Sequence, residues 1–469
     1  MASRILTQRC KEKLSHDGHL FIFDRSSSKD KEIHFWRCER KDRCKARLHT
    51  KDGQIVKSLN EHTHGPSPAQ VQVACFKTSI RERAAVALEP PSVIINQCLT
   101  DISQASLAVI PSYDSLKKTI NRKRISVLNV PNDPANLEEL IIPESYRMYI
   151  PEPGVTENFL LCDRGNGSER IIIFGRQSWL KILVTSRIWF ADGTFSIAPK
   201  LFSQCYVILA KENGGVHPIV YALLQNKSTR TYVNMFQILK EIEPNLNPAS
   251  IVCDYEQAAH CAMRAIFPNV QIKGCFFHLG QNMQKHLASD GFISSYRNDP
   301  DFALKAKMII ALSFVPLSKI DLYFDTLANE LSHGFSSLLN WFEDTYVGRQ
   351  NRRGGGRRAP LFPHEIWNLH ERVLNGEDRT NNYAEAAHRR LQFELGMNNP
   401  TIWKFIDGLR KVQKGRDTHY VQLSTGRPPK PKLQKYLAAD QRIHDLVLRF
   451  DDMDAIGYLQ SIAHNYQME

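Results

Sequence analysis

The sequence predicts a mixed α/β sheet with an α-helical insertion, preceded by a small β-rich module that a metal ion stabilises. Three observations support this prediction. Strand and helix patterns alternate over residues 151–290, helical patterns dominate residues 290–469, and residues 1–66 contain two cysteines and two histidines at the spacing Cys-x5-Cys, seventeen residues, His-x-His. The chain has 469 residues, enough for about three domains, and its 42% hydrophobic residues are typical of a globular protein.

The α/β region has the clearest pattern. Consecutive apolar runs predict three strands, at 187–191, 202–211 and 216–224. Helix and strand patterns then alternate, with helices at 231–242, 257–266 and 276–287 and strands at 250–253 and 270–274. Three strands followed by alternating units build a mixed sheet with helices on its faces, and this order matches the ribonuclease H-like fold.

Two aspartates follow apolar strands of this region. Asp192 and Asp254 stand at the carboxyl ends of the strands at 187–191 and 250–253, where open α/β sheets place their sites. Carboxylates brought together there repel unless a cation neutralises them, and such hard oxygen ligands suit Mg²⁺ or Mn²⁺. Glu385 is a third candidate, on a helix that Asn381 or Asn382 can cap. The alternatives are a turn for Asp192, a helix cap for Asp254 and a solvated helix face for Glu385.

The N-terminal module offers a set of zinc ligands. Cys38, Cys44, His62 and His64 supply two thiols and two imidazoles, the donors that tetrahedral zinc prefers. Large apolar side chains are few over about 60 residues, and a domain of that size usually needs a metal or disulfides. Two free cysteines and two surface histidines are the alternative.

The charge indicates a polyanionic partner. The chain has 61 basic and 49 acidic residues, a net charge of +12, and nucleic acid is the commonest partner of such a protein. Residues 1–66 carry +6, residues 352–358 carry +4 and residues 404–435 carry +7, which leaves −5 for the rest. In the N-terminal module the candidate DNA contacts, with a solvated face as the alternative, are Arg37, Arg40, Lys41, Arg43 and Lys45. In the glycine-rich loop they are Arg352, Arg353, Arg357 and Arg358, with a disordered insertion tip as the alternative. No apolar run reaches the roughly 18 residues that a membrane span requires.

A series of motifs in the α/β region resembles the Mutator-like element (MULE) transposase domain. They are Asp192-Gly-Thr-Phe195, Ala198-Pro-Lys-Leu-Phe202, the run His217 to Leu224, Cys253-Asp-Tyr-Glu256, Cys275-Phe-Phe-His278-Leu-Gly-Gln281 and Thr380-Asn-Asn382 leading to Glu385. The resemblance is dense over residues 185–290 and reaches residue 391 after a gap. Where related sequences often carry Gly-Trp after the glutamate, this chain has Ala386-Ala387.

This resemblance implies a DDE-type transposase core. Asp192, Asp254 and Glu385 would hold two Mg²⁺ or Mn²⁺ ions for phosphoryl transfer on DNA. His278 would approach the scissile phosphate or position a metal ligand, and a buried thiol beside an ordinary histidine is the alternative for Cys275 and His278. The 131 positions between Asp254 and Glu385 would hold the α-helical insertion of related transposases.

The N-terminal module resembles a FLYWCH-type zinc finger, on His34-Phe-Trp-Arg-Cys38 and the closing His62-Thr-His64. That resemblance implies a β-sheet zinc domain that presents a sheet edge to the DNA major groove. We therefore expect five regions, at 1–66 (zinc finger), 67–150 (helical linker), 151–290 (transposase core), 291–375 (helical insertion) and 376–469 (C-terminal helices with the third carboxylate).

The predicted function is a nuclear DNA transposase. Its partner would be double-stranded DNA, at the transposon ends and the target, with a homo-oligomer left open. Lys117-Lys118 and Arg122-Lys-Arg124 form a basic cluster that suits nuclear import, an exposed helix face being the alternative. Two other functions remain open, a domesticated, non-catalytic zinc-finger DNA-binding protein and a ribonuclease H-like nuclease that acts on RNA or free ends.

Overall fold

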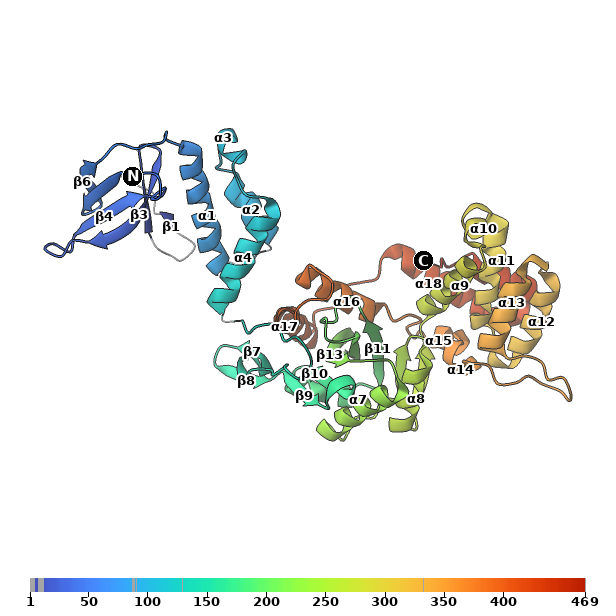
Figure 1. Cartoon of the computed structure of the whole chain (residues 1–469). Helices are drawn as coiled ribbons and strands as arrows, with labels where there is room; N and C mark the ends of the chain where they lie inside the picture. The colour runs from blue at the N-terminus through green and yellow to red at the C-terminus, as the bar shows by residue number, and fades with distance from the viewer. Residues whose placement is uncertain are drawn as a thin grey trace. The chain divides into compact units, whose positions relative to one another are not determined.

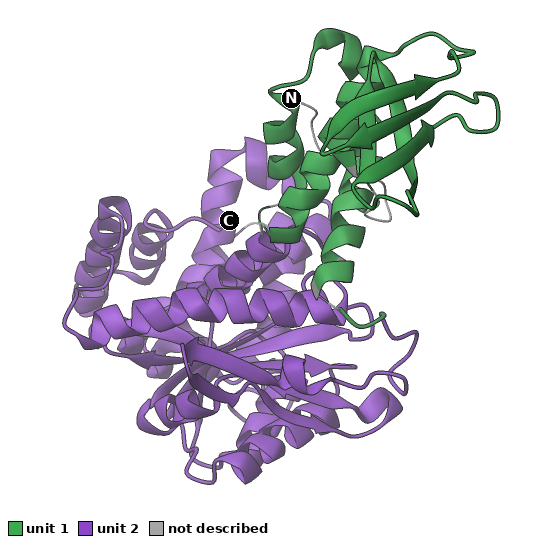
Figure 2. Cartoon of the chain, turned by 90° about the vertical axis from the view of Figure 1, so that its left-hand side faces the viewer, with its two compact units in different colours: residues 1–132 green, residues 133–469 purple. Residues whose placement is uncertain are grey.

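The computed structural model describes residues 5–6, 12–86, 89, 91–128, 130–331 and 333–468. The chain divides into two compact units, residues 1–132 and residues 133–469 (Figure 2). Within the described ranges, no helix combines the length and the apolar character needed to cross a membrane.

Unit 1 begins with an antiparallel sheet whose strands follow one another in chain order. Its described strands are β1 (Ile5–Leu6), β2 (Glu12–His16), β3 (His19–Ser26), β4 (Ile33–Cys38), β5 (Arg47–Lys51) and β6 (Gln54–Leu59). Tight turns at Asp17-Gly18 and Asp52-Gly53, all with positive φ, join two of the hairpins. The sheet's core is small, with Phe21, Trp36 and Leu48 as its large buried side chains, as the sequence predicts.

Four helices follow the sheet in the described part of unit 1. They are α1 (Pro68–Val86), α2 (Pro91–Leu99), α3 (Gln104–Leu107) and α4 (Tyr113–Leu128). Phe76, Ile80, Ile95 and Ile120 are fully or almost fully buried among them. Figure 1 shows α1 lying beside the sheet, with α2 and α4 packed on its other side. In α4, Lys118 and Arg122 of the basic cluster are exposed.

Unit 2 is built on a mixed sheet. Within the described residues its strand order is β15-β14-β11-β12-β13-β10-β9. The strands are β9 (Leu160–Arg164), β10 (Ile171–Phe174), β11 (Ile188–Thr194), β12 (Gln204–Glu212), β13 (Gly215–Leu224), β14 (Ser250–Cys253) and β15 (Gln271–Gly274). β11, β14 and β15 run parallel, and the other neighbours pair antiparallel. The five strands from β11 to β15 confirm the sequence prediction, whereas β9 and β10 were not predicted.

Helices cover both faces of this sheet. α7 (Thr229–Ile242) and α8 (Gln257–Ile266) pack together, and α16 (Asn382–Leu395) and α17 (Ile402–Ser424) form a second layer (Figure 1). In β11, Trp189 meets Phe267 after α8, whereas its neighbour Phe190 meets Tyr383 of α16. Because side chains alternate along a strand, Asp192 faces the same side as Phe190, towards α16.

Helices fill the described part of the segment between β15 and α16, which includes the helical insertion expected at residues 291–375. Its helices are α9 (Phe276–Ser289), α10 (Ile293–Asn298), α11 (Pro300–Ala311), α12 (Ile320–Glu330), α13 (Ser336–Phe342), α14 (His364–Trp367) and α15 (His370–Leu374). The C-terminal α18 (Gln434–Leu448) and α19 (Ala455–Ala463) pack against it, and one continuous apolar core joins these helices to the sheet. The other α-helices and β-strands in the described part of unit 2 are α5 (Glu144–Arg147), β7 (Met148–Glu152), β8 (Val155–Asn158) and α6 (Leu180–Thr185).

Candidate zinc and carboxylate sites

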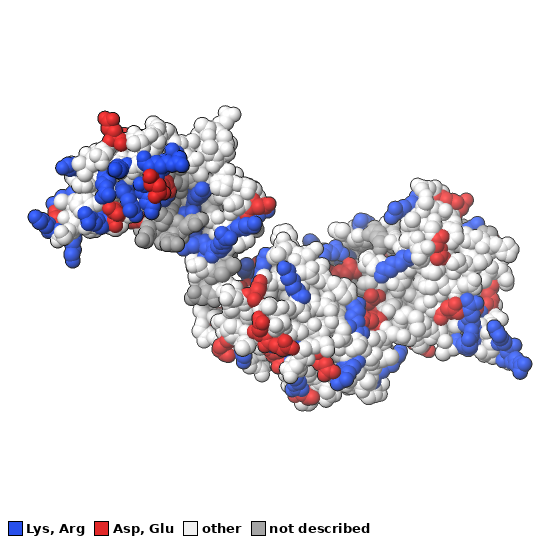
Figure 3. Space-filling view, viewed as in Figure 1, with Lys and Arg blue, Asp and Glu red and all other residues white. Residues whose placement is uncertain are grey.

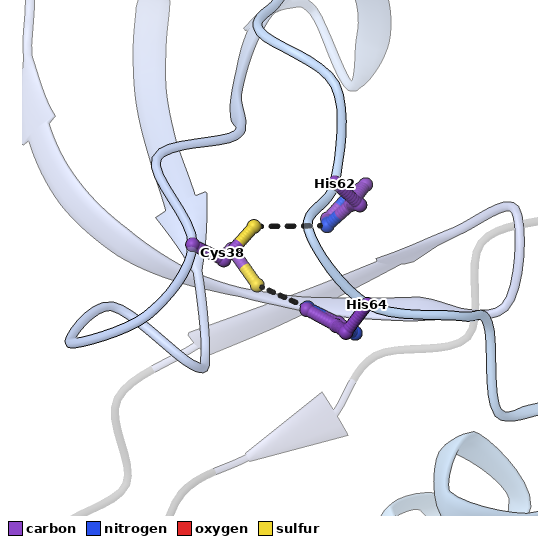
Figure 4. A group of neighbouring side chains, drawn as sticks. Cys38, His62 and His64 are labelled. Carbon is purple, nitrogen blue, oxygen red and sulfur yellow. Dashed lines mark hydrogen bonds between the residues drawn. The ribbon is translucent and has the colours of Figure 1, made fainter.

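The four predicted zinc ligands converge at one end of the β-sheet of unit 1. Cys38 ends β4, Cys44 lies in the loop before β5, and His62 and His64 follow β6. Cys38 Sγ is 3.2 Å from His64 Nε2, and Cys44 Sγ is 3.3 Å from His62 Nδ1 (Figure 4). The four ligand atoms all lie within 4.8 Å of one another, and both cysteines are buried. Among the described residues, no other group of three or more such side chains is gathered so closely.

This geometry fits a tetrahedral zinc ion. Zn–S and Zn–N bonds of about 2.3 and 2.0 Å at tetrahedral angles put a sulfur and a nitrogen about 3.6 Å apart, close to the two observed distances. His64 Nδ1 lies 3.1 Å from the Gly65 carbonyl oxygen. A proton on Nδ1 that is donated to this carbonyl leaves Nε2 free to bind the metal, which is the usual way a backbone group fixes a histidine ligand.

The three predicted carboxylates also come together, at the carboxyl edge of the parallel strands. Asp192 lies on β11, Asp254 directly follows β14, and Glu385 is on the first turn of α16. Two histidines lie among them. His388 Nδ1 is 3.6 Å from Asp192 Oδ2, and His278 Nδ1 is 3.8 Å from Asp254 Oδ1. The cluster therefore joins a residue of β11, a residue that follows β14 and a residue of α16, which lies beyond the helical insertion.

Burial and mutual repulsion shape the charge of this cluster. Burial, followed by the charges of Asp254 and Glu385, raises the pKa of Asp192 from 3.8 to about 7. Burial, followed by the nearby His278, lowers the pKa of His388 to about 4, so that its imidazole is neutral at pH 7. Glu385 Oε1 is buried and accepts no hydrogen bond from the described part of the chain. A divalent cation would stabilise the ionised form of these carboxyl groups.

Two families match separate parts of the chain. Residues 5–64 match the family model of the FLYWCH zinc finger domain, and residues 188–282 match that of the MULE transposase domain. The chain carries a FLYWCH zinc finger and a MULE transposase domain. Both resemblances expected from the sequence are confirmed, and together these domains indicate transposase-related DNA binding.

Two curated proteins of Caenorhabditis elegans are similar to the finger. FLYWCH transcription factor 2 is 41% identical over 64 residues, and FLYWCH transcription factor 3 is 40% identical over 58 residues. The matches cover 13% and 12% of this chain, and 13% and 14% of those two proteins. These two similarities are thus limited to the finger. The match to the zinc finger family model, together with the cysteine and histidine group, supports a structural zinc ion.

The FLYWCH finger contains a further histidine that the sequence did not single out. His19 stacks on His62 with ring centroids 3.6 Å apart and meets the His64 ring edge-on at 4.9 Å. It follows the Asp17-Gly18 turn and is 9% exposed. In the sequence, only this turn, which leads into β3, could have indicated that His19 contacts His62 and His64. His19 therefore packs against both imidazole ligands and orients them.

The basic residues of the finger lie outside the metal group. Arg40, Lys41, Arg43 and Lys45 are exposed in the loop that carries Cys44, where exposed and buried side chains alternate up to β5. Arg37, on β4, lies 3.7 Å from Asp24 and is part-exposed. Figure 3 shows lysine and arginine side chains gathered on this face of unit 1. The loop thus turns its thiol towards the metal group and its cations towards solvent.

Three other residues of the sequence motifs in unit 2 have contacts that the sequence did not indicate. Asn381 stands at the N-cap position of α16, but its side chain caps no helical N–H group and donates instead to the Ala191 carbonyl of β11. Burial raises the pKa of the Cys275 thiol to about 11, so Cys275 is a neutral thiol at pH 7. Glu256, two residues after Asp254, accepts a hydrogen bond from Tyr232 and pairs with Lys227.

The arginine loop of the insertion is a hairpin with a fixed base. Gln350 and Arg357 pair across it, and at Gly348, whose φ is +93°, a Cβ atom would come within 1.9 Å of the Arg358 carbonyl oxygen. The side chain of Arg357 is 6% exposed and contacts Asp321, Asp325 and Glu343, the last at 2.6 Å. Arg352, Arg353 and Arg358 are exposed. Arg357 thus anchors the hairpin, whereas the other three arginines face solvent.

Proposed function

We propose that the protein is a MULE-type DNA transposase with a ribonuclease H-like core that cleaves DNA and transfers strands. One observation carries the proposal: Asp192, Asp254 and Glu385, 193 positions apart from first to last, meet at the carboxyl edge of one sheet. The fold supports it, because three antiparallel strands are followed by two that lie parallel to the first. A site that brings carboxylates together in this way suits divalent-metal-dependent phosphoryl transfer.

The residues of the cluster fit Mg²⁺ or Mn²⁺. Asp192, Asp254 and Glu385 would hold the ions, and the unpartnered, buried Oε1 of Glu385 is the kind of oxygen that a cation would take up. When bound, two such ions activate the attacking hydroxyl or water and stabilise the leaving oxygen. His278 lies at the edge of the cluster beside Asp254, where it can contact a DNA phosphate or keep Asp254 in position. The protein itself contributes position and charge neutralisation.

Double-stranded DNA would be the partner, in the nucleus. In the finger, the exposed Arg40, Lys41, Arg43 and Lys45, together with Arg37, would contact it. In the insertion, Arg352, Arg353 and Arg358 would contact the backbone, and Arg357 is left out because its carboxylate partners occupy it. The proposal keeps the five regions expected from the sequence, with one change: residues 133–150, expected in the helical linker, belong to unit 2.

A second function deserves a direct test, because both curated relatives of the finger are transcription factors. In that case the chain would be a domesticated DNA-binding protein that uses the finger and no longer cleaves DNA.

Cleavage of the element's own ends decides between these functions. The zinc-loaded, full-length protein should cleave DNA that carries its terminal inverted repeats when Mg²⁺ or Mn²⁺ is added. Asp192→Asn, Asp254→Asn and Glu385→Gln should each abolish cleavage and leave DNA binding intact. Glu394→Gln is a matched control, because Glu394 is on the same helix as Glu385 but pairs with Lys411. Binding of the authentic ends without cleavage would refute the transposase and favour the DNA-binding protein.

A further inference from the structure

The three carboxylates of the proposed site differ in how the fold holds them. Asp192 and Asp254 are on or next to neighbouring strands, and the parallel ladder that pairs Trp189 with Ile251 and Phe190 with Val252 fixes their separation. Glu385 has no such ladder. It arrives on α16, after the whole helical insertion, so something else must fix this helix at the edge of the sheet.

Asn381, the residue before α16, makes that connection. Its side chain is fully buried, and its Nδ2 donates to the Ala191 carbonyl oxygen at 3.0 Å. Ala191 immediately precedes Asp192, just beyond the last residue of the β11–β14 ladder. The asparagine side chain therefore extends the hydrogen bonding of β11 to the start of the helix that carries Glu385.

The backbone of Asn381 makes a second connection, to the Cys-x-x-His segment. Its N–H group donates to Cys275 Sγ at 3.1 Å, and the Phe276 N–H group donates back to the Arg379 carbonyl oxygen at 2.9 Å. Cys275 lies directly between β15 and α9, three residues before His278. The start of α16 is thus tied to two of the elements that carry the other residues of the cluster.

Arg372 also connects the end of β15 to the segment before α16. It is 6% exposed, and its guanidinium donates to the carbonyl oxygens of Gly274 and Asp378. The end of β15 and the segment before α16 therefore remain together through main-chain groups as well as through Cys275.

We propose that Asn381 and Cys275 form a clamp that sets the position of Glu385 relative to Asp192, with Asn381 as a positioning residue and Cys275 as its sulfur acceptor. This inference rests on the proposed metal-binding role of the three carboxylates. The two ends of the Cys-x-x-His motif then have different roles. Cys275 holds the start of α16, whereas His278 lies beside Asp254.

The test compares variants of the full-length, zinc-loaded protein. Asn381→Ala removes the side-chain donor, and Asn382→Ala changes the exposed neighbour as a control. Cys275→Ala removes the sulfur acceptor, whereas Cys275→Ser keeps an acceptor at the same place. Two quantities are measured: the Mn²⁺ dissociation constant by electron paramagnetic resonance, and hydrogen exchange of residues 383–391 without added Mg²⁺ or Mn²⁺.

The clamp predicts weaker Mn²⁺ binding and faster exchange in Asn381→Ala and Cys275→Ala. The loss of affinity should be about tenfold or more, as for other residues that orient metal ligands. Asn382→Ala and Cys275→Ser should stay close to the wild type. Wild-type affinity together with wild-type exchange in Asn381→Ala would overturn the inference. If Asn381→Ala does not fold, Cys275→Ala is compared with Cys275→Ser. Wild-type Mn²⁺ affinity together with wild-type exchange in Cys275→Ala would then overturn the inference.

The proposed function can fail separately. If the wild type binds Mn²⁺ no better than Glu385→Gln does, the metal site itself is refuted. Hydrogen exchange in the metal-free protein then still shows whether Asn381 and Cys275 fix α16.

Discussion

Replacing Asp192 with asparagine should stabilise the metal-free protein at alkaline pH. The side chain of Asp192 is 12% exposed, and burial beside Asp254 raises its pKa from 3.8 to about 7. A shift of about 3 units, at 1.36 kcal/mol per unit, corresponds to about 4 kcal/mol lost by the folded state once the carboxyl group ionises. Asparagine has the same shape, carries no charge, and can still accept the hydrogen bond from the Gly193 N–H group.

The pH dependence of the free energy of unfolding explains why the substitution should stabilise the protein. Between pH 3.8 and about 7 the folded protein retains a proton on Asp192 that the unfolded chain has lost. The free energy of unfolding of the wild type therefore falls as the pH rises through this window, and the full penalty is present above it. The advantage of Asp192→Asn should be about 1 kcal/mol at pH 4.5 and about 4 kcal/mol at pH 8.

Urea unfolding followed by tryptophan fluorescence measures this difference in unit 2, which holds five of the six tryptophans. The finger is kept zinc-loaded, and no Mg²⁺ or Mn²⁺ is added. Glu330→Gln, at the exposed end of α12, is the control and should show no such trend. Adding Mn²⁺ at pH 8 should stabilise the wild type alone and narrow the gap. An equal gain at both pH values, or no gain, would refute the electrostatic account of the cluster.

Three more predictions concern the finger and the hairpin. Chelation of zinc should abolish hydrogen-exchange protection over residues 12–64 and leave the sheet of unit 2 protected, because metal binding and folding are coupled in so small a core; retained protection would contradict the zinc assignment. His19→Ala should weaken zinc affinity about tenfold in a competition titration with a chelating dye, because it removes the ring that orients His62; an unchanged affinity would show that this ring only fills space. Arg357→Ala should lower the free energy of unfolding by about 2 kcal/mol, because it removes charged hydrogen bonds from a mostly buried guanidinium. Arg353→Ala, at an exposed arginine of the same hairpin, should instead weaken DNA binding and reduce its salt dependence, and it should leave the free energy of unfolding unchanged. The reverse pattern would mean that the roles of these two arginines are exchanged.

Local patterns were sufficient to predict the central sheet. The strands from β11 to β15 and the helices α7, α8 and α9 follow uninterrupted apolar runs and helical spacing, which depend only on neighbouring residues. β9 and β10 are short, and pairing makes them strands: β10 pairs with β13, and β9 pairs with β10 at the edge of the sheet. The zinc ligands could also be predicted from the sequence, because two cysteines and two histidines at this spacing in one small module are typical of a zinc site.

The roles of Asn381 and Arg357 depend on partners distant in the sequence. An asparagine before a helix usually caps it, and only the fold places the Ala191 carbonyl, 190 positions away, within reach of this one. An arginine in a glycine-rich loop is usually solvated, but the carboxylates of Asp325 and Glu343 approach Arg357 from elements that precede the loop. Residue type and spacing carry no information on such contacts.

The closed base of the arginine hairpin has a consequence for the continuity of the chain. Both ends of the insertion are fastened at the junction of β15 and α16, and the hairpin is fastened again by Gly348, Gln350 and Arg357. The peptide bonds at Gly354 to Gly356 connect exposed residues that fill no core. Two separate polypeptides divided at Gly355 should therefore assemble into the same unit, and added sequence at this tip should be tolerated. The tip is a place where the length of the protein can change while its carboxylate cluster stays intact.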